Sequence, residues 1–90
     1  AASDPFLATA HPVTELEFKS MAAGYFSDWH PAPRRQVVIS LSGEMEIGIA
    51  DGTVRRFRPG DVLLAEDVVG RGHRTRTVGS QPHVMAQIPF

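Results

Sequence analysis

The 90-residue sequence contains no cysteine, which excludes a disulfide or a thiolate-bound metal as a stabilising link. Neither sign of charge is in excess, because nine Lys and Arg residues stand against ten Asp and Glu residues, for a net charge of -1. This balance provides no general attraction to nucleic acid or to anionic lipid. The apolar runs are also far too short to cross a bilayer. We therefore expect neither nucleic acid nor a membrane as a partner.

The start of the sequence shows no targeting signal. Residues 1–10 contain no basic region followed by an apolar stretch, so we expect no signal peptide. A cytoplasmic location is the default expectation, and secretion stays open in case a leader has been removed. Ninety residues make one small domain with a thin core. A partner subunit or a bound metal would help to stabilise such a domain.

Short β-type runs separated by turn residues fill the chain. The clearest is 44–50, where Met45, Ile47 and Ile49 alternate with polar residues. The run 36–41 is apolar on both faces, which indicates a strand covered on both sides. Asp51-Gly52 predicts a type I′ hairpin. We predict seven or eight strands, with runs at 13–18, 25–29, 36–41, 44–50, 53–57, 61–65, 73–78 and 83–88. No convincing helical periodicity occurs, so the fold class is all-β, a sandwich or barrel.

Two spaced groups of residues resemble the motifs of the cupins. In the first, Gly24, His30 and Gly43 fall at the motif's spacing, but Ala32 and Gln36 stand where a second histidine and a glutamate are usual. In the second, Pro59-Gly60-Asp61 is typical, Glu66 replaces a proline, and His73 comes two residues later than usual. The chain is thus similar to a small single-domain cupin, of the conserved-barrel type, with a degenerate first motif.

The resemblance implies a cupin jelly-roll barrel of about eight antiparallel strands. The barrel would cover about residues 13–88, after an N-terminal arm of residues 1–12, so that 1–90 is a single cupin domain. Cupins hold a metal inside the barrel through these motif positions. Carried over residue by residue, the metal ligands here are His30, Gln36 and His73, and Ala32 contributes nothing.

This ligand set suits several divalent ions. Neutral nitrogen donors favour copper, iron, zinc or nickel, with copper highest in the stability series, and manganese is also open. The set has no anionic ligand, so we expect weaker binding than at an intact site. Glu66 or Asp67 would supply a carboxylate if the longer loop before His73 folds inward. Two of these ligands also have other interpretations: His30 as a structural histidine, and Gln36 as a substrate contact or a pin for the loop at 31–35.

Five further residues are candidates for binding a small molecule. One of Arg34 and Arg35 would face inward at the barrel mouth and bind a carboxylate or phosphate; the alternative is two solvated charges in a loop. Trp29 and Tyr25 would stack on a ligand at the mouth, or else pack in the core or an interface. Met45 would line the barrel. Arg74 and Arg76 share one face of their strand, opposite Glu44 and Glu46, and indicate a surface with ion pairs.

Three functions follow as hypotheses. The first is a metal-binding cupin that acts as an oxidoreductase, isomerase or lyase. Its substrate would be a small polar or carbohydrate-like molecule, and the oxidoreductase is slightly favoured. The second is a metal-free cupin that binds a small acidic or sugar-like ligand. The third is a non-catalytic module. The strand at 37–41, which is apolar on both faces, predicts a homodimer in all three cases.

Overall fold

The computed structural model describes residues 8–90, so most of the predicted arm, residues 1–7, lies outside the described part. Eight strands follow one another, and no helix occurs between residues 8 and 90. They are β1 (Glu17–Met21), β2 (Phe26–His30), β3 (Gln36–Ser42), β4 (Glu44–Ile49), β5 (Val54–Phe57), β6 (Val62–Ala65), β7 (His73–Val78) and β8 (His83–Pro89). Residues 8–90 therefore contain no helix that is long and apolar enough to cross a membrane.

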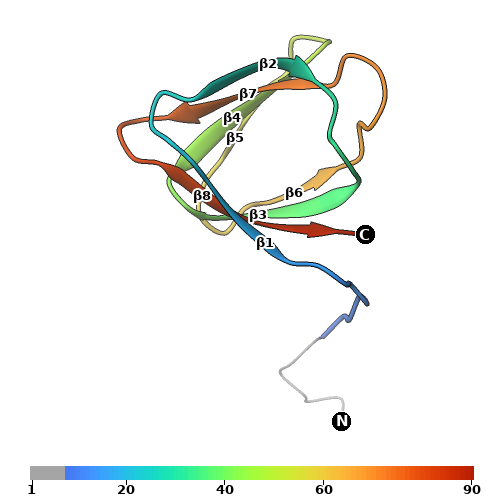
Figure 1. The fold of residues 1–90 in the computed structure, drawn as a ribbon. Coiled ribbons are helices and arrows are strands. Elements are labelled where there is room, and N and C mark those ends of the chain that lie inside the picture. Colours follow the sequence, from blue (N-terminus) through green and yellow to red (C-terminus); the bar gives the residue numbers. More distant parts are fainter. Residues whose placement is uncertain (1–7) are drawn as a thin grey trace, which may run out of the picture.

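The strands form two four-stranded sheets that face each other (Figure 1). The first sheet has the order β1-β8-β3-β6 and the second the order β2-β7-β4-β5, with every pair antiparallel. Sequence neighbours such as β1 and β2 therefore lie in opposite sheets. This alternation between sheets is the jelly-roll arrangement, and it confirms the predicted all-β barrel.

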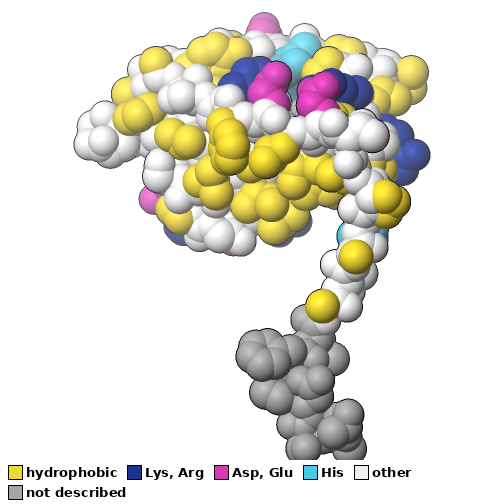
Figure 2. Space-filling model, turned by 60° about the horizontal axis from the view of Figure 1, so that its bottom comes forward, with side chains coloured by type: hydrophobic (Ala, Val, Ile, Leu, Met, Phe, Trp, Pro, Cys, Tyr) yellow, Lys and Arg dark blue, Asp and Glu magenta, His cyan; other side chains and the backbone are white. Residues whose placement is uncertain are grey.

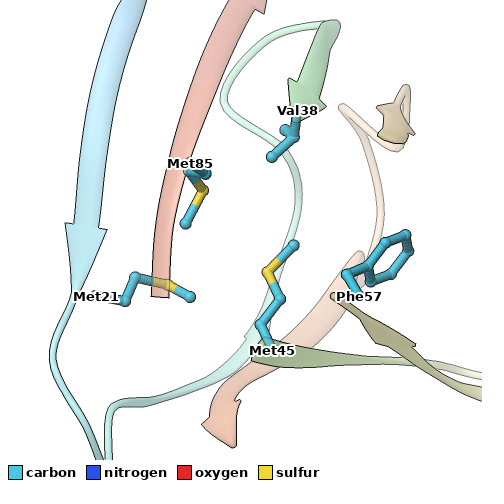
Figure 3. Close-up of a cluster of buried hydrophobic side chains, with 5 residues drawn as sticks. All are labelled: Met21, Val38, Met45, Phe57 and Met85. Atoms are coloured by element: carbon cyan, nitrogen blue, oxygen red, sulfur yellow. The ribbon is translucent and has the colours of Figure 1, made fainter. Parts of the chain in front are cut away.

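The core lies between the sheets and is small. Five buried side chains form it and point toward one another from both sheets (Figure 3): Met21, Val38, Met45, Phe57 and Met85. Ile47 and Leu63 pack against this cluster. Burying a side chain of this size contributes about 1.5–3 kcal/mol. Three of the five are methionines, whose flexible side chains fill irregular space.

The strand boundaries correct the sequence-based prediction at the start of the chain. A strand was expected at 13–18, but β1 begins at Glu17 and ends at Met21. The reason is its partner, because Met21 pairs with His83 and Glu17 pairs with Gln87 near the end of β8. Met21 faces the core, whereas Phe18 is 68% exposed on the other face.

The turn between β4 and β5 also differs from the prediction. A type I′ turn needs positive φ at both central residues, but among residues 8–90 only glycines have positive φ, and Asp51 does not. Instead, the Gly52 N–H donates to the Ile49 carbonyl, and the Ile49 N–H donates to the Thr53 carbonyl. This is a three-residue hairpin loop in which Gly52, at φ 91°, takes the left-handed position. Ile49, which alternation places on the same face as Met45 and Ile47, lies at this end of β4 and is 43% exposed.

Candidate metal and ligand site

A cavity of about 110 Å³ opens into the barrel between the sheets. Its polar lining includes His30, Gln36, His73, Thr75 and Gln87. Its floor and walls include residues of the core cluster, such as Met45. Since a single water needs about 10–15 Å³, this volume has room for several waters or for a metal with a small ligand.

His30 and His73 lie side by side on neighbouring strands. They are register partners across β2 and β7, and their ring centroids are 4.6 Å apart at an interplanar angle of 57°. The pairing of the two strands is irregular between Ser27 and His30. Such an irregularity re-aims a side chain, and here the His30 ring lines the cavity. Two histidines 43 positions apart in the sequence thus meet in one hollow.

The hydrogen bonds of both rings define the same tautomer. His30 Nδ1 lies 2.7 Å from the Asp28 carbonyl oxygen, with the Ser27 hydroxyl at 3.1 Å. A carbonyl oxygen only accepts, so Nδ1 must carry the proton. His73 Nδ1 lies 2.6 Å from Asp67 Oδ2 and donates to that carboxylate. In the neutral form each ring therefore keeps a lone pair on Nε2, and neither Nε2 has a hydrogen-bond partner among residues 8–90.

Asp67 is the carboxylate that the longer loop brings inward. Its main-chain oxygen accepts from the N–H of Ala32, and its side chain accepts from His73. The other candidate, Glu66, points elsewhere and pairs with Arg35 at 2.7 Å. Asp67 thus contacts the Nδ1 side of the His73 ring and does not line the cavity itself. Sequence reasoning named Asp67 only as a possible ligand, because its hydrogen bond depends on how the loop folds.

Gln36 brings a third polar side chain to the cavity. It begins β3, is 5% exposed and lines the cavity. Its Oε1 is buried and has no hydrogen-bond partner among the described residues. Buried polar atoms are nearly always paired, so this oxygen indicates a missing partner such as a water, a ligand or a cation.

The position of the usual second histidine is occupied by a buried methyl group. Ala32 is 3% exposed and lines the same cavity. Because its side chain is short, it leaves space where an imidazole would reach inward. Residues 8–90 contain no group of three or more His, Cys, Asp or Glu side chains arranged to hold a metal.

The five candidate ligand-binding residues separate into two groups. Met45 and Tyr25 line the cavity. Arg34, Arg35 and Trp29 do not: Arg34 pairs with Glu15 and Arg35 with Glu66 on the outside. The Trp29 ring lies against the guanidinium groups of Arg71, at 4.1 Å, and Arg74, at 4.8 Å. Lys19 and Gln87, which sequence reasoning did not single out, line the cavity from β1 and β8; the inward alternation of Met85 and Gln87 was the available signal.

A wider hollow, of about 530 Å³, adjoins His73. It lies beside β4, β6 and the loop that carries Asp67. Ile47, Leu63 and His73 line both this hollow and the inner cavity.

Comparison with solved structures establishes the class of fold. A Cupin 2 conserved barrel domain protein from Salinispora arenicola has a TM-score of 0.66 and 23% identity, over 96% of this chain and 69% of that one. The Cupin_2 domain of an XRE family transcriptional regulator from Enterobacter cloacae has a TM-score of 0.57 and 28% identity, over 83% and 81%. The chain therefore has the cupin-type barrel fold, as its resemblance predicted.

A third structure has the same fold in a longer protein. It is a conserved protein with a double-stranded beta-helix domain from Klebsiella pneumoniae, with a TM-score of 0.64 and 23% identity over 81% of this chain. The present chain spans 63% of that protein. Comparison with protein-family models and with curated proteins finds no match.

Proposed function

We propose that this cupin-type domain binds a divalent transition-metal ion inside the barrel and presents it to a small polar molecule. The ligands would be Nε2 of His30, Nε2 of His73 and Oε1 of Gln36. The observation that carries the proposal is the pair of adjacent imidazoles, each with Nδ1–H donated to an acceptor and Nε2 left free. Histidines that ligate metals almost always donate their other N–H to a carboxylate or carbonyl.

The donors suit copper, nickel, zinc or iron, because imidazole nitrogen is a good ligand for all four. All three donors are neutral, so the metal would be held less tightly than by a set that includes a carboxylate. Asp67 offsets part of this loss, since its carboxylate accepts the Nδ1 hydrogen bond, which fixes the ring of His73 in the orientation and tautomer that a metal ligand needs. A bound metal would polarise a substrate oxygen or activate dioxygen, as oxidoreductases, isomerases and lyases require.

The chain's own residues would orient the ligand. Asp67 and the Asp28 carbonyl hold the two rings in place. Gln87 and Tyr25 line the cavity and can hydrogen-bond a polar molecule. The short side chain of Ala32 leaves the space for it. These features support a small polar substrate.

Metal titration by calorimetry tests the proposal on protein freed of any affinity tag. Cu²⁺, Ni²⁺ and Zn²⁺ are added to the wild type and to the His30→Ala and His73→Ala variants. We expect each variant to lose at least about 10-fold in affinity, and Asp67→Asn to lose about 10- to 100-fold. His11→Ala is the matched control, because His11 is exposed and lies ahead of β1. Equal affinity in wild type and His30→Ala would disprove this function.

A metal-free binding module is the second candidate. It is favoured by the absence, within residues 8–90, of three clustered His, Cys, Asp or Glu side chains. The likeness to the Cupin_2 domain of a transcriptional regulator also supports a regulatory rather than a catalytic role. An acidic or sugar-like ligand would then bind to Gln36, Gln87 and Lys19. A melting temperature that a chelator leaves unchanged, together with no metal in the titration, would favour this candidate.

A further inference from the structure

Lys19 is the only lysine in the chain, and it lines the inner cavity from β1. It shares its side of the strand with Met21, two positions further on, which packs in the core. Its register partner Met85 also lines the cavity, whereas the neighbouring Phe18 faces the other way and is 68% exposed. Because Lys19 itself stays exposed, it borders the cavity on the solvent side.

No other charged side chain lines this cavity. Its walls contain no Asp, Glu or Arg. Asp67 contacts His73 from outside the cavity. Glu17 lies on the same side of β1 as Lys19 but does not reach the lining, and Lys19 has no ion pair within residues 8–90. The cavity therefore has a positive charge at its border and no negative charge to balance it.

The arginines, by contrast, all have partners. Five are paired with carboxylates: Arg34, Arg35, Arg56, Arg58 and Arg76. The other three lie against aromatic rings: Arg55, Arg71 and Arg74. Figure 2 shows acidic and basic side chains lying together on one side of the barrel. The pairing of Arg76 with Glu46, at 2.8 Å, also confirms the ion-paired surface predicted from the sequence. Within residues 8–90, Lys19 differs from the arginines in having neither kind of partner.

A second observation indicates a ligand in this cavity. The side chain of Gln36 is buried, and its Oε1 has no hydrogen-bond partner among the described residues. In the proposed metal site this amide oxygen, together with the imidazoles of His30 and His73, brings no negative charge to the ion. A ligand that carries a carboxylate would supply the missing charge, and it would be attracted by the metal and by Lys19 alike.

We propose that the small molecule bound in this cavity is a carboxylate anion and that Lys19 is the residue that selects it. The inference rests on the proposed function, since it concerns the same cavity, but selection by Lys19 does not require the metal. An ammonium group forms a charge-assisted hydrogen bond with a carboxylate, and a neutral sugar-like molecule offers no such partner. The cavity measures about 110 Å³. A 150 Å³ cavity holds benzene, so an anion of about six non-hydrogen atoms or fewer would fit.

Matched acids and amides test the selection by charge. Acetate, propionate and glycolate are titrated into metal-free protein, prepared on a chelating resin, and so are acetamide, propionamide and glycolamide at the same ionic strength. Chemical shifts of the backbone amides report binding. Each acid should bind at least about 10-fold more tightly than its amide, because hydrogen bonds to charged groups are the stronger ones.

Variants of Lys19 assign this preference to one side chain. Lys19→Met removes the charge at similar length and should abolish the preference for acids, whereas Lys19→Arg keeps the charge and should retain it. Arg58→Met is the matched control, because it removes the same charge outside the cavity. Equal binding of acetate and acetamide by the wild type, no binding of either up to about 100 mM, or an unchanged preference in Lys19→Met would overturn the inference.

Metal titration separates this inference from the proposed function. Without a carboxylate present, Lys19→Met should bind Ni²⁺ or Zn²⁺ at least as tightly as the wild type, because it removes a positive charge that repels the ion. A wild type that binds no metal but prefers acetate through Lys19 would disprove the metal site and support the selection of anions. Normal metal binding without any preference for acetate would do the reverse.

Discussion

His83 is a histidine that the fold keeps neutral. It begins β8, is fully buried, and shares a hydrogen bond of 2.9 Å between Nε2 and the Ser40 hydroxyl. Its Nδ1 is buried and has no partner among residues 8–90. A protonated ring would need a second acceptor there, and none is present. Burial accordingly lowers the pKa of His83 below its usual value.

This gives stability a pH dependence of known sign. The unfolded chain protonates His83 near its ordinary pKa of about 6.5, whereas the folded chain resists protonation. The stabilisation is complete above that pH and is lost as pH falls through the lower folded value, at up to about 1.4 kcal/mol per pH unit. Denaturant unfolding between pH 7 and 5 should show a shallower slope for His83→Gln. The exposed His11→Gln should keep the wild-type slope; equal slopes for wild type and His83→Gln would refute this account.

At the scale of an element, the loop between β6 and β7 determines where His73 lies. Gly72 has φ 77°, and a Cβ on it would lie 1.9 Å from the His30 carbonyl oxygen. The loop therefore passes directly against the backbone of β2, which brings the two rings together. Gly70 has a similar φ of 80° but has open space around it.

The two glycines separate backbone strain from close contact. Gly70→Ala should destabilise the protein by about 1 kcal/mol, because alanine is strained in the left-handed conformation but its Cβ would meet no neighbouring atom. Gly72→Ala should cost at least twice as much in the free energy of unfolding, since the backbone must also move. It should weaken metal binding about as much as His73→Ala does. Equal effects of the two substitutions in denaturant unfolding and in metal titration would contradict this role of Gly72.

Strand existence was more predictable than strand ends and side-chain direction. Alternation predicted β4 and β7 within a residue, because each has one face on the core and one in solvent. The direction of the Trp29 side chain was harder to predict, because the irregular pairing between Ser27 and His30 interrupts the alternation of β2. Arg34 and Arg35 precede β3, and their carboxylate partners lie 19 and 31 positions away in the sequence. No local pattern carries that information.

For the whole molecule, the meeting of His30 and His73 was predictable from motif spacing, and the apolar outer side of β3 was visible in its sequence. The extent of the apolar outer surface of that sheet was not predictable, because it arises only when β1, β8, β3 and β6 assemble in that order. A core of five side chains in a cysteine-free chain gives marginal stability.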